Sequence, residues 1–237
     1  MDGLHSIGLF VRSIPISTPS RGSAAQCQAG RSSSARPEIH LRRPYILPTV
    51  RRGIFGGTFD PIHIAHLSAA EVAFHALQLD VVTFIPAGDP WQKSHRNISS
   101  AEDRLAMTRL ATGGVDYFEV DDREVRRHGP TYTVDTLAEM PDDDITLILG
   151  ADGAAGLGSW HRSDEVLDRV DVAVVPRPGT SVDDVTAVAR DRLTWISMPE
   201  LDISGVRLRS MVASGLSIRF LVPETVWEYI VERRLYV

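Results

Sequence analysis

Short apolar runs of strand length alternate along the chain with segments in which apolar residues recur at helical spacing. The apolar runs predict strands at 51–56, 81–86, 117–120, 145–149, 172–175 and 193–197. The helical segments are 65–79, a segment that starts at 99, 134–140, 164–169, 182–190, 204–213 and 223–233. Because strands alternate with helices, the pattern predicts an α/β fold with a doubly wound, mostly parallel sheet and C-terminal helices.

Two of the predicted helices have starts that the sequence marks. Ser99 and Glu102 have the spacing of a capping box, in which each side chain accepts a backbone N–H of the first turn. Pro223 is expected in the first turn of the last helix, where its missing N–H has no partner to lose.

The composition changes near residue 50 and divides the chain. Residues 1–50 hold six Arg, eight Ser and two acidic residues, for a net charge of +4, whereas residues 51–237 carry −10. The first segment has little hydrophobic periodicity and cannot bury enough apolar surface to offset the entropy of ordering. We expect a disordered Arg/Ser-rich extension over 1–50, although its composition also matches a transit peptide. If the natural start lies later, Val50 is the residue that a GTG codon would supply.

Charge, hydropathy and cysteine content limit the classes of partner that we expect for this protein. The acidic domain offers no basic run for a phosphate backbone, so we expect no nucleic acid. No apolar stretch approaches the roughly 18 residues that span a membrane, so we expect no membrane partner. Cys27 is the only cysteine and lies in the extension, which fits a cytoplasmic protein without disulfides. Small molecules remain as partners, and a homo-oligomer remains open.

The segment GGTFDPIHIAH, residues 56–66, follows the first predicted strand. Gly56 and Gly57 let the backbone turn sharply and approach a ligand closely. Asp60 precedes a proline and avoids helical geometry, so the helix is expected to start just after it. His63 then lies at the start of the helix and His66 in its first turn, on the same face.

This arrangement predicts a phosphate site, because a helix N-terminus offers unpaired N–H groups and a partial positive charge. His63 and His66 add donors there, and we expect them to stabilise charge and not to pack. Two alternative interpretations stay open. The histidines could be a helix cap and a surface residue, or they could be a pair of metal ligands. The usual helical zinc pair has i, i+4 spacing beside an acid, whereas Ile64 and Ala65 separate these histidines, so no metal-ligating residue is predicted.

Two cations elsewhere fit the same chemistry. Lys93 is the only lysine, against 24 arginines, and a compact ammonium group suits a triphosphate. Arg209 lies in the second turn of the helix predicted from Ser204, which makes a second anion site. The alternatives are a solvated loop lysine and a capped surface helix that carries Arg207 and Arg209.

The string GGTFDPIHIAHL is similar to the nucleotidyltransferase signature G-G-[ST]-F-D-P-x-H-x-G-H. Over residues 51–237 the chain further resembles one branch of that family, the bacterial nicotinate-nucleotide adenylyltransferases. The segments that carry this resemblance are FIPAGDPWQK (84–93), GPTYTVDTL (129–137), LGADGAAGLGSWHR (149–162), VPRPG (175–179), ISGVRLR (203–209) and VPETVWEYIVERRLYV (222–237).

The resemblance implies a Rossmann-like catalytic domain over 51–237 that transfers the adenylyl group of ATP to nicotinate mononucleotide. The products would be deamido-NAD and pyrophosphate, with Mg²⁺ held mainly by the ATP phosphates. The attacking phosphate is already ionised and needs no protein nucleophile or general base, and the sequence offers no GxSxG and no reactive cysteine. Catalysis would then consist of alignment and charge stabilisation.

The resemblance also assigns roles to single residues. The catalytic set is His63, His66, Lys93 and Arg209. The ATP-binding set is Gly56, Gly57, Thr58, Phe59, Asp60, Gly150, Asp152, Ile203 and Ser204. Thr131, Tyr132 and Trp160 are assigned to nicotinate mononucleotide, by stacking on the pyridine ring and binding its carboxylate. The two aromatic residues are otherwise core residues, and Asp152 is otherwise a helix cap.

The chain departs from the family pattern at a few positions. Ala65 stands where the family has Gly, and its methyl group would crowd or shift the adenine. Gly205 and Val206 replace Ser and Thr hydroxyls at the second anion site. Gln92 differs from the commoner residue before the lysine.

Three other functions are compatible with parts of the pattern. HIAH resembles the HIGH motif of class I aminoacyl-tRNA synthetases, but the chain has no KMSKS-like loop and no room for a tRNA-binding domain. Pantetheine-phosphate adenylyltransferases share the signature and match less well around SWHR and the C-terminal segment. A non-catalytic nucleotide-binding protein is favoured by the altered ISGVRLR motif.

Overall fold

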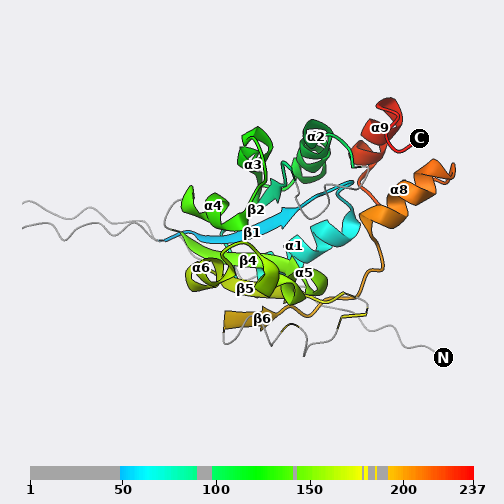
Figure 1. Cartoon of the computed structure of the whole chain (residues 1–237). Coiled ribbons are helices and arrows are strands. Elements are labelled where there is room, and N and C mark those ends of the chain that lie inside the picture. Colours follow the sequence, from blue (N-terminus) through cyan, green and yellow to red (C-terminus); the bar gives the residue numbers. More distant parts are fainter. Residues whose placement is uncertain (1–48, 90–97, 141–142, 178, 181–184, 186–191) are drawn as a thin grey trace, which may run out of the picture. The chain divides into compact units, whose positions relative to one another are not determined.

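The computed structural model describes residues 49–89, 98–140, 143–177, 179–180, 185 and 192–237. Its strands form a six-stranded parallel sheet in the order β3-β2-β1-β4-β5-β6 (Figure 1). They are β1 (Arg51–Gly57), β2 (Val81–Pro86), β3 (Phe118–Val120), β4 (Asp144–Gly150), β5 (Asp171–Val175) and β6 (Leu193–Trp195). The predicted doubly wound α/β fold is confirmed, and every strand pair is parallel.

The helices connect the strands and close the C-terminal part. They are α1 (Ile64–Ala76), α2 (Ala101–Thr112), α3 (Arg123–Arg126), α4 (Thr133–Ala138), α5 (Ala151–Ala155), η2 (Leu157–Ser159), α6 (Ser163–Arg169), α8 (Gly205–Ala213) and α9 (Glu224–Glu232). None of the helices in the described part of the chain has the length and apolarity that a membrane crossing requires.

The strand order reverses next to β1. β1 pairs with β2 on one side, where Gly57 lies opposite Pro86, and with β4 on the other, where Ile54 lies opposite Leu147. The chain therefore leaves β1 toward β2 and later returns to its other side. In doubly wound folds ligands bind beyond the carboxyl ends of the strands at such a reversal.

Alternate residues of the strands fill two separate cores, because successive side chains of a strand point to opposite faces. Phe55 and Ile148 belong to the cluster that includes residues of α1, α8 and α9. Ile54 and Leu147 belong to the cluster that includes residues of α4, α5 and α6. Both faces of the sheet are thus covered, as the apolar strands require.

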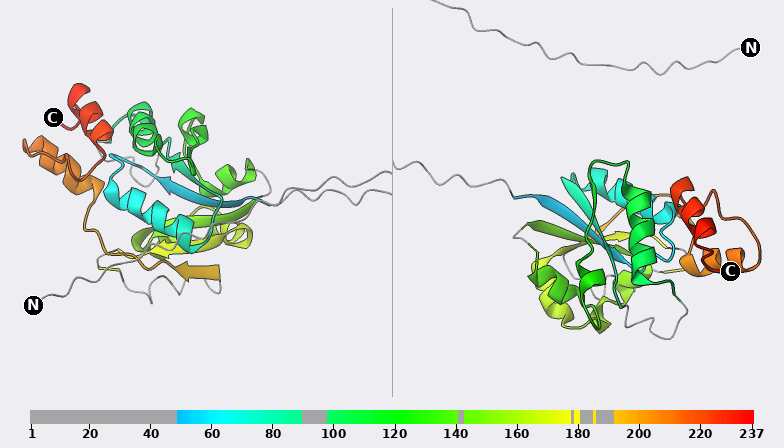
Figure 2. Two further views of the ribbon diagram at one scale, coloured as in Figure 1. Left: turned by 180° about the vertical axis from the view of Figure 1, so that it is seen from behind. Right: turned by 90° about the horizontal axis from the view of Figure 1, so that it is seen from above.

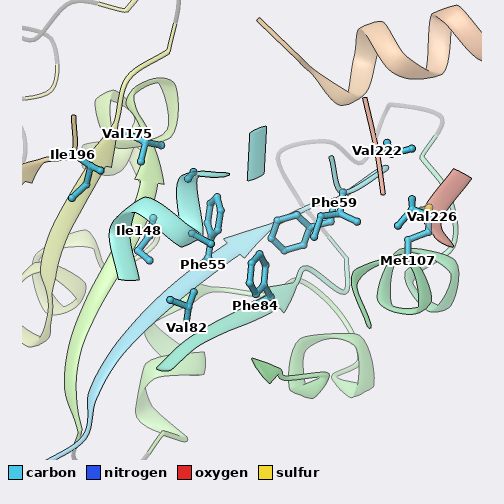
Figure 3. Close-up of a cluster of buried hydrophobic side chains, with 14 of the residues drawn as sticks. Phe55, Phe59, Val82, Phe84, Met107, Ile148, Val175, Ile196, Val222 and Val226 are labelled. Carbon is cyan, nitrogen blue, oxygen red and sulfur yellow. The ribbon is translucent and has the colours of Figure 1, made fainter. Parts of the chain in front are cut away.

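Figure 3 shows the first cluster, in which three phenylalanine rings from β1, its following loop and β2 meet. The ring of Phe84 lies 5.6 Å from Phe55 and 5.9 Å from Phe59, measured between centroids. Phe59 reaches this core with φ of +50°, a left-handed conformation that turns the chain sharply after β1. The core therefore fixes the loop that carries the histidine motif.

Several helix boundaries differ from the prediction. α1 ends at Ala76 and not at residue 79, because Gln78 has φ of +52° and turns the chain into β2. Ser100, and not Ser99, caps α2, and its hydroxyl accepts the N–H of Asp103 at 3.0 Å. The backbone N–H of Ser99 is instead held by Asp60.

Other differences concern α9 and the short helices. Pro223 is the N-cap of α9 and not part of its first turn. The sequence did not predict α3, α5 and η2, which have at most five residues each and show no full helical period. Most of the predicted helix 182–190 lies outside the described residues.

The last two helices lie at one end of the sheet. Figures 1 and 2 show α8 and α9 near one another, beyond the end of β1. The segment before α8 and the residues after α9 are therefore available to line a site at the carboxyl ends of the strands.

Candidate active site

A cavity of about 530 Å³ lies at the carboxyl ends of β1 and β4. Gly56, Gly57 and Gly150 form part of its floor, and the starts of α1, α4, α5 and α8 contribute its walls. This is the point at which the strand order reverses.

Most of the predicted site residues line this cavity. They are Gly56, Gly57, Thr58, Phe59, Asp60, His63, His66, Thr131, Tyr132, Gly150, Asp152, Trp160, Ser204 and Arg209. Ile203 lies beside it, where its carbonyl oxygen accepts a hydrogen bond from Nη1 of Arg177 at 3.3 Å. Lys93 and Gln92 lie outside the described residues.

The two histidines stand together at the start of α1, as predicted. His63 is the N-cap and His66 lies in the first turn, and their rings stack with centroids 3.7 Å apart. The backbone N–H of His63 donates to Nδ1 of His66 at 3.2 Å. Because Nδ1 accepts, the neutral His66 ring carries its proton on Nε2. Phe55 and Phe59 pack against this ring edge-on and fix its orientation.

His63 is far more enclosed than the sequence suggested. Its side chain is buried, with 1% exposure, and the His66 ring packs against Phe55 and Phe59, so the expectation that the two histidines do not pack is wrong. Burial and the nearby positive charge of Arg177 lower the pKa of His63 to about 3. His63 is therefore neutral at pH 7. Its buried Nδ1 has no hydrogen-bond partner among the described residues.

Arg209 faces the same cavity and is held by Asp60. Its Nη1 donates to the backbone oxygen of Asp60 at 2.7 Å and lies 3.6 Å from Oδ2 of the carboxylate. The described residues accept no hydrogen bond from Nε or Nη2 of Arg209, so these two nitrogen atoms keep their donors for a ligand.

The start of α8 explains one departure from the family pattern. Ser204 is the N-cap, and its hydroxyl accepts the N–H of Arg207 at 3.3 Å. A Cβ on Gly205 would lie 2.7 Å from the backbone oxygen of Asp60, so glycine lets α8 approach this loop closely. Arg207 pairs with Asp202 on the exposed surface, which confirms the surface-helix interpretation for Arg207 but not for Arg209.

The other end of the cavity is aromatic. The Tyr132 ring lies over the His161 ring with centroids 4.3 Å apart, and Trp160 contributes a further wall. Tyr132 and Trp160 also pack against the second core, so they are core and cavity residues at once. Thr131 is buried beside them, with its hydroxyl group bonded to Glu124.

Asp152 does not cap a helix. The N-cap of α5 is Gly150, and the carboxylate of Asp152 lies 3.4 Å from Nε of Arg177. The capping interpretation is therefore wrong.

Three ionisable residues of the cavity wall were not predicted as site residues: Glu124, His161 and Arg177. Burial raises the pKa of Glu124, and the Thr136 hydroxyl donates to its carboxylate at 2.7 Å. Of the three, Arg177 could have been predicted from the sequence. It stands just after β5 in the VPRPG segment, at a carboxyl end of the sheet, where ligands bind.

Arg104 of α2 ties together the loops that border the cavity. Its side chain is 1% exposed, and its guanidinium donates to the backbone oxygens of Thr58, Ala87, Gly88 and Ser99. The loops after β1 and β2 are thus fixed to the start of α2 by one buried cation. No pattern in the sequence predicts this role for Arg104.

Comparison with known proteins assigns the family. The cytidylyltransferase-like family model matches residues 54–211. The chain belongs to the cytidylyltransferase-like family. It is 40% identical over 195 residues to a protein of Acidothermus cellulolyticus named probable nicotinate-nucleotide adenylyltransferase, which covers 78% of this chain and 94% of the relative. A Streptomyces coelicolor protein of the same name is 43% identical over 185 residues, which covers 76% and 98%.

Solved structures show the same cytidylyltransferase-like fold. A Plasmodium falciparum nicotinic acid mononucleotide adenylyltransferase complexed with NaAD matches with a TM-score of 0.68 and 18% identity, over 79% of this chain and 97% of the other. The same enzyme complexed with APC matches with a TM-score of 0.65.

Proposed function

We propose that this protein transfers the adenylyl group of ATP to nicotinate mononucleotide and releases deamido-NAD and pyrophosphate. The observation that carries the proposal is one cavity with two unlike ends. One end has the start of α1, His66 and Arg209 for phosphates, and the other has Tyr132 and Trp160 for a flat ring. Relatives at 40% to 43% identity are named for this activity.

In this proposal the triphosphate of ATP lies against the start of α1. Gly56 and Gly57 let the phosphates come close to the backbone, and His66 donates from Nε2 to the α-phosphate. Arg209 binds the pyrophosphate part with its remaining donors, and Lys93 adds a further positive charge. Thr58, Phe59, Ile203 and Ser204 contribute the adjoining backbone, and Asp152 binds a ribose hydroxyl beside Gly150.

The reaction is a substitution at the α-phosphorus. A phosphate oxygen of nicotinate mononucleotide forms a new P–O bond, and the bond to the oxygen that bridges the α- and β-phosphates breaks. The electron pair of that bond leaves with pyrophosphate. No proton has to be removed from the attacking phosphate, because it is already ionised. The protein therefore aligns the groups and stabilises negative charge.

In this proposal neutral His63 does not contact the phosphates itself but holds His66 in position. Its backbone N–H fixes the Nδ1 of His66, and its ring stacks on the His66 ring. His66 then presents Nε2–H in a fixed direction. A preorganised donor of this kind typically contributes about 3 to 4 kcal/mol to transition-state stabilisation.

Magnesium enters as part of the MgATP substrate. Within the described ranges no three His, Cys, Asp or Glu side chains gather to hold a metal ion. The carboxylate of Asp60 is already engaged by Tyr236 and Ser99. This lining fits a magnesium ion whose ligands are phosphate oxygens and water. Such an ion would neutralise negative charge on the phosphates.

The aromatic end suits the pyridine ring of the second substrate. Tyr132 and Trp160 stack on the ring, and the backbone N–H of Thr131 binds its carboxylate. The His161 ring packs against the Tyr132 ring and holds it in place.

Pyrophosphate release tests the proposal. Purified protein is incubated with MgATP and either nicotinate mononucleotide, nicotinamide mononucleotide or phosphopantetheine, and the products are separated by chromatography. We expect deamido-NAD with the first acceptor at the highest kcat/KM. Preference for phosphopantetheine would assign the protein to the other adenylyltransferase branch, and ATP binding without transfer would identify a binding protein.

A further inference from the structure

The last residues of the chain fold back toward the cavity wall. After α9, Arg234 and Tyr236 have φ of +51° and +68°. The N–H of Leu235 bonds to the oxygen of Ile230 at 3.0 Å, and the N–H of Arg234 to that of Val231 at 3.2 Å. These two bonds form a Schellman motif. Left-handed geometry is unfavourable for residues with side chains, so tertiary contacts must hold this segment.

The contacts that hold it lead to the histidine loop. The Tyr236 hydroxyl donates to Oδ1 of Asp60 at 2.6 Å, across 176 positions of sequence. Leu235 and the Tyr236 ring pack against the first core cluster. Burial and the charge of Asp60 raise the pKa of Tyr236, so the phenol stays protonated and remains a donor.

Asp60 connects this tyrosine with the cavity. Its carboxylate is buried, and its two oxygens have different partners. Oδ1 accepts from Tyr236, whereas Oδ2 accepts the N–H of Ser99 at 3.2 Å and lies 3.6 Å from Nη1 of Arg209. The bond from Tyr236 holds the carboxylate so that its Oδ2 lies beside Nη1 of Arg209, and the same nitrogen donates to the backbone oxygen of Asp60 at 2.7 Å. Tyr236 itself does not line the cavity.

We propose that Tyr236 is a positioning residue that sets the affinity for ATP through Asp60 and Arg209. This proposal rests on the proposed function in one respect, namely that Arg209 binds the phosphates of ATP. It predicts that the hydroxyl group, and not only the ring, of Tyr236 matters to the nucleotide.

The chain offers a matched control on the preceding helix. The Tyr229 hydroxyl donates to Oδ1 of Asp103 at 2.8 Å, which is the same bond from a tyrosine of α9 to a carboxylate. Asp103 does not line the cavity. Y236F and Y229F therefore remove equivalent groups, of which only one leads to Arg209.

The experiment measures MgATP binding by calorimetry without a second substrate, and then kcat and KM for each substrate. For Y236F we expect a Kd and KM for ATP about tenfold higher, with the KM for nicotinate mononucleotide within twofold of wild type. For Y229F we expect both values unchanged. Wild-type protein that binds ATP but makes no deamido-NAD would refute the proposed function and still allow the comparison of Kd values.

A double-mutant cycle separates direct from indirect action. If Tyr236 acts through Arg209, Y236F has no further effect on ATP affinity in an Arg209→Ala background. Equal effects of Y236F and Y229F, or an effect of Y236F that persists without Arg209, would overturn the proposal. If Y236F melts far below wild type, the same cycle is measured at a temperature well below its melting transition, where all variants are folded and the comparison of Kd values decides.

Discussion

Arg104 and Arg209 both donate hydrogen bonds to the loop that joins β1 to α1. They differ in how many of their guanidinium nitrogen atoms are left without a partner among the described residues. Arg104 is 1% exposed and donates to backbone oxygens of three separate segments. Arg209 uses one nitrogen on Asp60 and faces the cavity with the others. A cation whose three nitrogen atoms all donate to the backbone holds the fold, whereas a cation with nitrogen atoms to spare can bind an anion. The comparison predicts opposite consequences for stability and activity.

The largest effect is expected from Arg104→Leu. This change leaves four backbone oxygens without their buried donor, so we expect the free energy of unfolding to fall by about 3 to 5 kcal/mol. Urea unfolding measures it. A loss under 1 kcal/mol would show that water replaces the guanidinium and would remove the distinction from Arg209.

Arg209→Gln is expected to act on catalysis instead. The glutamine retains a donor for the oxygen of Asp60 but removes the charge, so kcat/KM for ATP should fall about 100-fold, or about 3 kcal/mol of transition-state stabilisation. The free energy of unfolding should fall by less than for Arg104→Leu in the same urea titration. A variant with wild-type turnover would place Arg209 among the structural cations.

His63 sharpens the comparison because it is buried without a charge. Its pKa is near 3 in the folded protein and about 6.5 when unfolded, so the unfolded state binds more protons between these values. Stability due to neutral His63 is complete above pH 6.5 and is lost as the pH falls toward 3, by about 1.4 kcal/mol per pH unit at most. His63→Asn should flatten this acid limb in urea titrations from pH 7 to 4. An unchanged limb would show that His63 is protonated or solvated in the native state.

The smallest effect concerns the extension over 1–50. We predict that a chain starting at Val50 matches the full chain in melting temperature and in KM for ATP, since an Arg/Ser-rich segment without apolar periodicity contributes few buried contacts. Val50 should be kept, because its backbone oxygen accepts the N–H of Asp144 at 3.0 Å. A higher KM in the shorter chain would mean that arginines of the extension act on the phosphates.

The sequence predicted those parts of the molecule that local patterns determine. The strands at 81–86 and around 145–149 are continuous apolar runs, and the glycines and histidines of 56–66 occupy a single strand-to-helix junction, so their neighbourhood follows from spacing alone. Thr131, Tyr132 and Trp160 were assigned to a site only through the resemblance to a family.

The remaining features depend on contacts between distant segments. Part of the lowered pKa of His63 comes from the charge of Arg177 beyond the end of β5. The role of Arg104 requires three loops to meet around it. Tyr236 and Asp60 are far apart in sequence, and no periodicity links them. The shift of the α2 cap to Ser100 has the same cause, because Asp60 holds the preceding residue.

The central position of β1 has a consequence for folding during synthesis. Among the described strands β1 is made first, yet Arg51 pairs with Asp144, which the ribosome adds much later. Until β4 arrives, one edge of β1 exposes unpaired backbone groups and the apolar residues of both faces, which makes it open to association with other chains. The pairing of β1 with β4 therefore forms late, and the ends of these two strands line the cavity. A nascent chain should therefore acquire protection from proteolysis in the β1–β2 unit before it acquires any affinity for nucleotide.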